Sequence, residues 1–458
     1  MPTLGSVLSI ATSGLRTSQL ALNVTSHNIA NASTEGYTRQ RLVMESGPPI
    51  HLTYGVFGTG VRAEDVQQSR DLLLDNTFRR EVAYSAGEQA RSDILGRVEG
   101  MFGEPSDLGL SATLDQFFSA LGDLATNPTD GTARTVVRQR ASQIVTQFND
   151  FVSGLDQIRQ EVEVRLDASV DRINALTEDI ASINRQIVSM ESAGDTAGDL
   201  RDQRNRALDE LATLIPIQVH PQDDGSVGVT ASGYHIADGV VSVPLEIRTS
   251  GGTVGLAIQG RPGMLPDLGG SVGGMLEVLN QDIPAIRATL DELANALVTE
   301  VNAIHVTGTN PLGGTGIDFF DPAGLTADTI ALSAEVAADA DAIAAGTPDG
   351  LGGYRAGAND VALSLAALRD VSIGSLGKTL GGHFRGLVSD VGSAVRSSQD
   401  AVGVHRALAE QADIRRMSIS GVSIDEELVS MIQYQTAYQA AAKVVTAVDE
   451  MLQSLINM

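Results

Sequence analysis

The stretch LGSVLSIATSGLRTSQLALNVTSHNIAN, residues 4–31, decides the fold. Alternate steps of four and three residues along it give the heptad spacing of a helix that packs against another helix. The sites of this first seam are Leu4, Leu8, Ala11, Leu15, Ser18, Leu22, Thr25 and Ile29. Arg16 is the only full charge between Met1 and Thr34, so the helix has no charged face to turn toward water. We therefore expect it to be covered on more than one side.

The last segment, residues 423–458, has the same character. Between Leu428 and Met458 it carries only Lys443, Asp449 and Glu450 as charges. Its seam contains Met431, Tyr434, Tyr438, Ala441, Val445, Val448, Leu452 and Leu455. Two such ends predict an antiparallel coiled coil, with the remaining apolar faces covered by neighbouring copies. On spacing alone, an ordinary contact between two helices of a monomer fits equally well.

The sequence after the first seam, HNIANASTEGYTRQ (residues 27–40), predicts a defined exit from the helix. Asn28 and Asn31 are polar groups at the end of an apolar helix. Gly36 can adopt a positive φ, and Tyr37 can bury its ring while its hydroxyl stays bonded.

This exit, together with ISGVSIDEE (419–427) and YQAAAKV (438–444) near the other end, resembles the terminal signatures of the bacterial flagellar rod, hook and hook-associated proteins. The resemblance implies an inner domain made of both chain ends, in a subunit that stacks with copies of itself by heterologous contacts, as a helical tube requires. The predicted assembly interface consists of Leu4, Leu8, Leu15, Leu22, Asn28, Ile29, Asn31, Gly36, Tyr37, Met431, Tyr434, Tyr438, Val445, Val448, Leu452 and Leu455.

The charges of the two ends are opposite in sign. Residues 1–62 carry four Arg against Glu35 and Glu45, a net +2, and residues 421–458 carry five acids against Lys443, a net −4. We expect this difference to help the ends find each other.

The composition excludes several classes of partner. Acidic residues outnumber basic ones by 57 to 31, so nucleic acid and anionic membranes are not expected as partners. The chain has no cysteine, and hence no disulfide and no thiolate metal site. It shows no Sec-type signal peptide and no apolar run of membrane-spanning length. The resemblance implies export in the unfolded state through the flagellar type III channel, with the protein ending up outside the cell.

The centre of the chain begins with long helical patterns. We expect helices at 71–102, 111–125 and 200–215, and between the last two a pattern from Val137 to Met190 that corresponds to about 80 Å of helix. Between Leu166 and Ile173 the apolar spacing falters at Ser169 and Arg172, which predicts a stutter or a break.

The pattern then changes to strands. Asp224-Gly225 and Asp238-Gly239 stand between alternating apolar residues, which predicts two hairpins in a small antiparallel β domain. Helical patterns return at 269–305, 359–368 and 380–417.

The predicted fold is therefore mainly α with a smaller β part: a terminal coiled coil, a long-helix bundle and the small antiparallel β domain. We expect five parts. They are residues 1–65 (half of the inner domain and a joint), 66–216 (long helices), 217–268 (β domain), 269–418 (further helices, with a short Ala/Gly-rich insertion at 307–355) and 419–458 (the other half of the inner domain).

Four central motifs resemble one branch of the flagellar family, whose subunits join the hook to the filament. They are Phe117-Phe118, Asn127-Pro128, Ala133-Arg134 and Asp202-Gln203-Arg204. At position 205 the resemblance leads us to expect an acidic residue, but the sequence has Asn205. We expect this difference to affect only one pair of side chains on a helix surface. The implied partners are further copies of the chain, the hook protein, the second hook–filament junction protein and an export chaperone at the C-terminal helix. Hook, distal rod and second junction proteins, and a non-flagellar coiled-coil binding protein, are the alternatives.

No motif predicts catalysis, a cofactor or a metal. The seven histidines are scattered without a ligand set, and GVFGTG (55–60) lacks the Lys and Ser/Thr of a phosphate loop. Asp223 and Asp224 lack the spacing of a calcium loop and are better explained as turn residues. Asp425, Glu426 and Glu427 favour a helix N-terminus over acid/base chemistry, although a hydrolase with two helix-borne carboxylates is the enzyme alternative.

Overall fold

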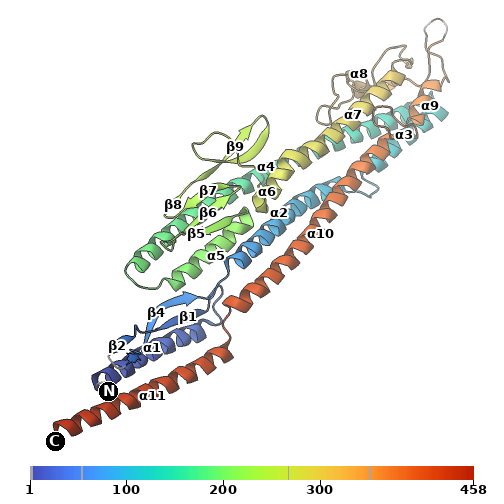
Figure 1. The fold of residues 1–458 in the computed structure, drawn as a ribbon. Helices are drawn as coiled ribbons and strands as arrows, with labels where there is room; N and C mark the ends of the chain where they lie inside the picture. The colour runs from blue at the N-terminus through green and yellow to red at the C-terminus, as the bar shows by residue number, and fades with distance from the viewer. Residues whose placement is uncertain (1–3, 53–54, 267, 350, 352, 458) are drawn as a thin grey trace.

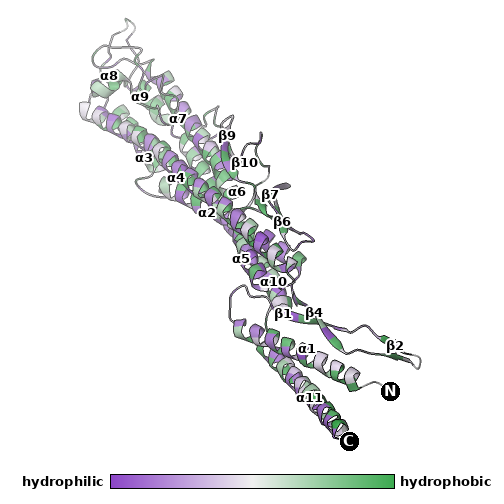
Figure 2. Ribbon diagram, turned by 90° about the vertical axis from the view of Figure 1, so that its left-hand side faces the viewer, coloured by the Kyte–Doolittle hydropathy of each residue, from purple (hydrophilic) through white to green (hydrophobic). Residues whose placement is uncertain are grey.

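The computed structural model of the chain describes residues 4–52, 55–266, 268–349, 351 and 353–457. The molecule is elongated, with both termini at one end (Figure 1). At that end α1 (Leu4–Asn31) lies beside α11 (Ile424–Ile456), and the two helices run in opposite directions. A bundle of long helices extends away from this pair, and small sheets lie both along its side and beside α1 (Figures 1 and 2). The mainly helical fold with a small antiparallel part is confirmed.

The long helices begin and end close to where the sequence predicts. They are α2 (Leu72–Phe102), α3 (Leu110–Thr126), α4 (Gly131–Ser192), α5 (Gly198–Leu214), α7 (Ile283–His305) and α10 (Leu380–Ser420). Asp71 caps α2 by accepting hydrogen bonds from the backbone N–H groups of Leu73 and Leu74. Gly103 ends the same helix with a φ of 61°, a conformation that glycine adopts without strain.

The predicted break in α4 is wrong, because this helix runs through 62 residues without interruption. The predicted stutter is present: the buried residues Ile158, Val162, Leu166, Val170 and Ile173 follow one another at steps of four, four, four and three, so the regular alternation of four and three is interrupted here. The two polar residues lie on the outer side: the Ser169 hydroxyl donates to the carbonyl of Arg165, and the Arg172 guanidinium pairs with Glu210 on α5.

Aromatic side chains connect the helices of the bundle. The rings of Phe102, Phe151 and Phe384 lie 5.3–5.8 Å apart in pairs and join α2, α4 and α10. Farther from the termini, Phe117 of α3 contacts Phe319 and Phe320, with ring centroids 5.7 and 6.4 Å away. All of these rings except that of Phe151 are almost completely buried, so they fix how the helices pack.

The predicted hairpins are present. A four-stranded antiparallel sheet has the order β5 (Gln218–Pro221), β6 (Val227–Ala231), β7 (Tyr234–Asp238) and β8 (Val241–Ser242). Gly225 and Gly239 adopt positive φ in its turns. Asp224 accepts hydrogen bonds from the N–H and hydroxyl of Ser226, as expected of a turn residue. A separate hairpin pairs β9 (Leu245–Ser250) with β10 (Thr253–Ile258).

The remaining elements are shorter. β1 (Gln40–Ser46) pairs with β4 (Val61–Gln68), and β2 (Ile50–Leu52) with β3 (Gly55–Phe57), so GVFGTG begins in a strand. The helix after Gly269 has three parts: α6 (Gly270–Glu277), the π-helical turn η1 (Val278–Asp282) and α7. Beyond α7 the chain forms loops with α8 (Ala334–Ala338), η2 (Ala340–Ala342) and α9 (Asp360–Ala367). No helix of the described chain is apolar over enough residues to span a membrane.

His305, the last residue of α7, links this helix to two loops at the far end of the molecule. Its Nδ1 lies 2.7 Å from the carbonyl oxygen of Ile317, and its Nε2 lies 2.9 Å from the backbone nitrogen of Ala344. A neutral ring with its proton on Nδ1 satisfies both contacts, since Nε2 then accepts from the N–H. Burial lowers the pKa of His305 below its ordinary value, because a charged ring would lose its hydration there.

Lowering the pH from about 7.5 to about 5.5 is expected to destabilise the bundle through His305. The unfolded chain takes up this proton near pH 6.5 and the folded chain only at a lower pH, so the stabilisation is complete above 6.5 and is lost as the pH falls. The loss is up to about 1.4 kcal/mol for each pH unit below 6.5. Urea titrations of the wild type and His305→Gln at both pH values measure it, because glutamine donates and accepts without titrating. An equal pH dependence of the two proteins would contradict this prediction.

Candidate functional site

The antiparallel contact between α1 and α11 is built on small residues. A Cβ placed on Gly14 would lie 3.8 Å from the Cβ of Ala441, and nearer the end of α1 the side chain of Asn28 contacts that of Glu427. The buried residues of α1 are Ala11, Thr17, Ser18, Ala21, Thr25 and Asn28. The absence of a side chain at Gly14 and the small side chain of Ala441 let the two helices approach closely there.

The chain by itself covers only part of the predicted interface. Two of its residues are buried, Asn28 and Val448. Three are exposed, namely Gly36, Tyr438 and Leu452. The half-buried ones are Leu4, Leu8, Leu15, Leu22, Ile29, Asn31, Tyr37, Met431, Tyr434 and Val445. The side chain of Leu455 lies outside the described part of the structure.

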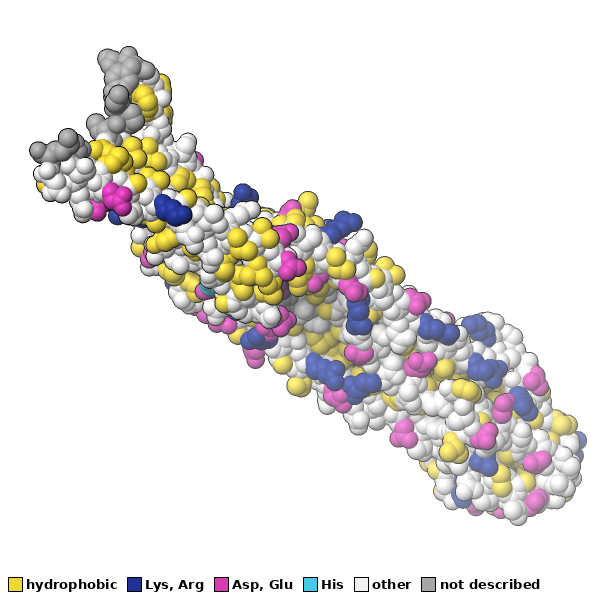
Figure 3. All heavy atoms as spheres, turned by 90° about the horizontal axis from the view of Figure 1, so that it is seen from below, with side chains coloured by type: hydrophobic (Ala, Val, Ile, Leu, Met, Phe, Trp, Pro, Cys, Tyr) yellow, Lys and Arg dark blue, Asp and Glu magenta, His cyan; other side chains and the backbone are white. Residues whose placement is uncertain are grey.

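Much of the apolar surface of α11 has no partner within the described chain. Its exposed large side chains are Ile424, Leu428, Val429, Ile432, Tyr438, Val444, Met451, Leu452 and Ile456. Figure 3 shows hydrophobic side chains gathered toward the end of the molecule that carries the termini, and charged side chains spread over the rest of this face. An exposed apolar surface of this extent is typical of a binding site.

Asn28 is the centre of the polar contacts where α1 ends, and it is buried with every hydrogen-bonding group used. Its Nδ2 donates to the carbonyl of Gln40 at 2.8 Å and to the Glu427 carboxylate at 3.0 Å. Its Oδ1 accepts from the Tyr37 hydroxyl at 2.8 Å and from the N–H of Gln40 at 3.0 Å. One side chain thus fixes the helix exit, the start of β1 and the start of α11. We call residues 32–40 and these contacts the joint.

The other signature residues shape the same turn. The Tyr37 ring stacks on His27 with centroids 5.6 Å apart, and burial, followed by nearby carboxylates, raises the pKa of Tyr37 above its ordinary value. Asn31 makes a local hydrogen bond to the carbonyl of His27. Gly36 has a φ of 75° and lies against the side chain of Arg206 on α5, where a Cβ would come within 2.9 Å of Arg206 Cγ. Both facts favour glycine at this position.

Arg39 joins the two ends of the chain by charge. Its Nε lies 2.8 Å from Oε1 of Glu427 and its Nη1 lies 2.8 Å from Oε2 of Glu426, while its N–H donates to the carbonyl of Ser420. Among the described residues, these are the ion pairs between residues 1–62 and 421–458, so the opposite charges of the ends meet at one point. Glu427 therefore does more than favour a helix N-terminus, because it is buried against Asn28 and Arg39.

Asp202 of α5 ties the joint to the bundle. Its carboxylate accepts from the N–H of Thr38 at 2.9 Å and from Gln68 Nε2 at 2.8 Å. Burial raises the pKa of Asp202 above its ordinary value, and these hydrogen bonds act in the opposite direction. Arg70 completes the group by donating to the Thr38 hydroxyl and pairing with Asp75 at 2.6 Å.

A second ionic group lies at the lower end of α10. Arg416 pairs with Asp209 and Asp413, both at 2.7 Å, and its guanidinium lies 4.1 Å from the centre of the Phe78 ring. Asp209 also accepts from the buried Arg79 at 2.7 Å. Asn205 contacts Arg79 at 3.5 Å. We expected Asn205 to affect a pair of residues on the helix surface, and this expectation is wrong because Arg79 is buried.

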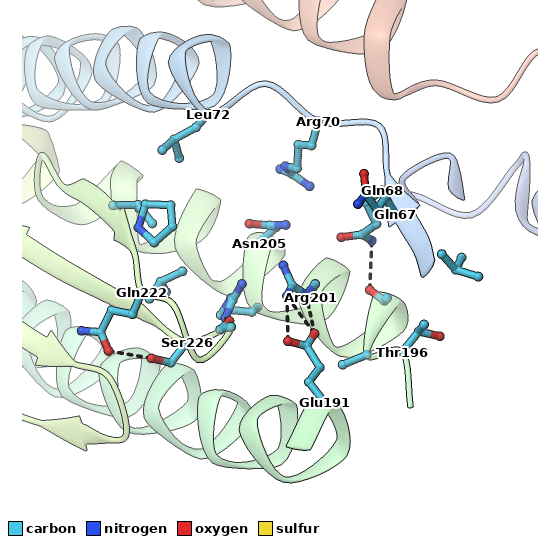
Figure 4. Close-up of a pocket in the computed structure, with 18 of the residues that line it drawn as sticks. Gln67, Gln68, Arg70, Leu72, Glu191, Thr196, Arg201, Asn205, Gln222 and Ser226 are labelled. Carbon is cyan, nitrogen blue, oxygen red and sulfur yellow. Dashed lines mark hydrogen bonds and ion pairs between the residues drawn. The ribbon is translucent and has the colours of Figure 1, made fainter. Parts of the chain in front are cut away.

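A polar cleft of about 680 Å³ lies between β4, the α4–α5 turn and the β5–β6 turn (Figure 4). On its wall Arg201 pairs with Glu191, and Gln68 donates to the carbonyl of Gly198. Arg204 is buried beside it and donates to Asn184 and to the carbonyl of Gly225. Burial lowers the pKa of Arg204 to about 10, so it stays charged at neutral pH. These contacts hold α5 against the β sheet. The charged side chains of the wall are engaged in them and do not form a catalytic group.

Asp202 and Arg204 show what the Asp202-Gln203-Arg204 motif does. Asp202 faces the joint and Arg204 faces the turn of the β sheet. Sequence reasoning named the motif but not its partners, because Thr38, Gln68 and Gly225 lie far from it along the chain. Within the described residues, no group of three or more His, Asp or Glu side chains is arranged to hold a metal ion.

Comparisons with known proteins agree with this architecture. A model described as the flagellar hook-associated protein FlgK helical domain matches residues 95–320. Models of the flagella basal body rod protein and of the C-terminal part of the flagellar basal body rod FlgEFG proteins match residues 8–38 and 415–458. The two rod models thus cover most of α1 and α11.

Similar whole proteins are found as well. Flagellar hook-associated protein 1 of Bacillus subtilis is 27% identical over 501 residues, covering 98% of this chain and 97% of the relative. The Escherichia coli protein of the same name is 27% identical over 548 residues, covering 99% of this chain and all of the relative. The solved structure of the flagellar hook junction protein FlgK from Burkholderia pseudomallei aligns with a TM-score of 0.66 and 17% identity, over 75% of this chain and all of that one.

Rod-type segments at both ends of a helical shaft define an axial protein of the bacterial flagellum, which is structural and not an enzyme. Within this class, the chain belongs to the flagellar hook-associated protein 1 family. The family predicted from the sequence is confirmed, and so is the place of the protein in the extracellular flagellum.

Proposed function

We propose that this chain is the subunit that joins the flagellar hook to the filament, and that it works as a helical homo-oligomer. The observation that carries the proposal is the unpartnered apolar surface of α11, which remains after α1 has packed against it. Neighbouring copies cover this surface in the tube, so that terminal helices form its inner wall. Contacts of this kind are heterologous and do not close on themselves, as a tube requires.

The same surface supports the proposed partners. The hook protein meets the subunit on one side of the junction and the second junction protein on the other. Before assembly, an export chaperone covers the C-terminal helix, because the exposed apolar side chains of its described residues would otherwise associate unspecifically. The chain passes through the type III channel unfolded, and the terminal pair completes its packing during assembly.

Replacing Ile432 by Asp tests this function. The side chain is 62% exposed in the single chain, so the substitution is expected to change the free energy of unfolding by less than about 0.5 kcal/mol. In the assembled wall the carboxylate would be buried without a partner, and we expect hooks without filaments. Electron microscopy of cells that carry the variant as their only copy measures the outcome.

Val164→Asp is the matched control. Val164 lies on the surface of the long helix α4 and is 68% exposed. Like Ile432 it is an exposed β-branched residue on a helix, but it lies on the bundle and not on α11. We expect normal filaments from this control. Normal filaments from both variants would reject the proposed wall.

A further inference from the structure

Arg204 on α5 is a buried cation without a carboxylate partner. It is 4% exposed and makes no ion pair with any residue that the structure describes. Its Nη1 donates to two neutral acceptors, Oδ1 of Asn184 at 2.8 Å and the carbonyl of Gly225 at 3.0 Å, and its Nε has no acceptor. A buried charge is costly unless it is both paired and hydrogen-bonded. Arg204 therefore lacks a countercharge and has an unused N–H.

Two other buried arginines of the described chain differ from Arg204 in this respect. The Nε of Arg79 donates to the carboxylate of Asp209 at 2.7 Å. The Nε of Arg134 donates to the carbonyl of Ile343 at 3.1 Å. Because both of these side chains use their Nε–H although they are more deeply buried, burial alone does not account for the unused group on Arg204.

The charges that line the polar cleft of about 680 Å³ are arranged by depth. Its arginines are all buried or half-buried, and two of them come from opposite walls (Figure 4): they are Arg70, Arg79, Arg201 and Arg204. The carboxylates of the lining that form no ion pair with a described residue are all exposed: they are Asp65, Asp195 and Asp223. Positive charge thus lies deep in the cleft, and unpaired negative charge lies at its rim.

The N-terminus of α5 adds to the positive potential at the inner end of the cleft. Ala197 and Gly198, where this helix begins, line the cleft, and no side chain caps the N-terminus. The N–H groups at a helix start carry partial positive charge and bind anions. After burial, the charge of Arg201 is the largest cause that lowers the pKa of Arg204, while Glu191 raises it. Arg204 therefore lies in a positive field.

We propose that the inner end of this cleft binds one small inorganic oxyanion, phosphate or sulfate, held by Arg204, Arg201 and the first turn of α5. The anion accepts from the guanidinium of Arg204 in a charge-assisted hydrogen bond and supplies the countercharge that this side chain lacks. The acidic rim repels long polyanions, which favours a single small ion. Its effect is to fasten α5 to the β5–β6 turn. This inference does not depend on the proposed function.

Thermal unfolding of the full chain tests the site. Sodium phosphate or sodium sulfate is added at pH 7.5, with sodium chloride used to hold the ionic strength constant, and a calorimetric titration gives the dissociation constant. We expect one anion per chain. At about a hundred times the dissociation constant we expect the unfolding midpoint to rise by about 2–4 °C. A midpoint that responds to these salts no more than to chloride would overturn the inference.

Substitutions in the cleft locate the bound ion. In Arg204→Gln and Arg201→Gln we expect the affinity for phosphate to fall at least about tenfold. Arg172→Gln is the matched control, because Arg172 also pairs with a glutamate on a helix surface but lies outside the cleft lining. Salts that are excluded from protein surfaces stabilise all variants alike, so the difference between variants reports the site.

The variants leave no outcome undecided. Weaker binding in the cleft variants together with wild-type binding in Arg172→Gln supports the inference. Unchanged affinity in the cleft variants assigns the ion to another place and overturns it. If Arg204→Gln does not fold, Arg201→Gln decides alone, because Arg201 is only half-buried. Equal affinities of Arg201→Gln and Arg172→Gln would then overturn the inference.

Discussion

Deletion of residues 424–458 is expected to abolish assembly while the long-helix bundle stays folded. The main hydrophobic core extends from Ile94 to Val395 in sequence and includes no described residue of α1 or α11. Beyond its packing on α1, α11 is held at the joint through Glu426 and Glu427. Its removal therefore takes away the surface for neighbouring copies and leaves the core intact.

Two measurements check this prediction. Thermal unfolding of the truncated chain is expected to show a midpoint within about 4 °C of the wild type, since about 1 kcal/mol or less is lost from the bundle. Cells with the truncated chain as their only copy are expected to carry hooks without filaments. Deletion of residues 1–31 should have the same two effects, and filaments built by either truncated chain would reject the prediction.

Replacing Asn28 by Leu is expected to detach the terminal pair from the joint at a cost of about 3–5 kcal/mol. The substitution removes four hydrogen bonds and leaves the buried Glu427 carboxylate without one of its partners. Hydrogen exchange of the backbone amides of residues 37–42 measures the effect, because opening of the joint exposes them to solvent.

Asn31→Leu is the control for this substitution. Asn31 is the same residue type on the same helix, but its Nδ2 bonds only locally, to the carbonyl of His27, and we expect a change below about 1 kcal/mol. Equal exchange rates in Asn28→Leu and Asn31→Leu would contradict the assigned role of Asn28.

Much of the fold could be predicted because it depends on local patterns. Apolar spacing located the long helices, and the Asp-Gly pairs located two hairpins. In α4 the stutter was predicted correctly and the break wrongly, because Ser169 and Arg172 lie on the outer side while the helix continues through the buried Val170. The division into five parts and the assembly residues stay predictions.

The joint could be predicted only in part. Asn28, Gly36 and Tyr37 stand out in the sequence because a polar, turn-forming group follows an apolar helix. Their partners Asp202 and Glu427 come from distant positions, and no periodicity connects them. The seam read from the sequence included the buried Ala11, Ser18 and Thr25, but it missed the buried Ala21, because heptad spacing does not select that position.

The antiparallel terminal pair has a mechanical consequence. Both chain ends leave the molecule at one tip, so tension between them peels the two helices apart from that tip (Figure 1). Asn28 and Glu427 lie at the opposite end of the pair and are the last to separate. The contacts of Asn28 and Glu427 are therefore the point at which separation of the two helices stops. They protect the long-helix bundle from force applied to the two chain ends.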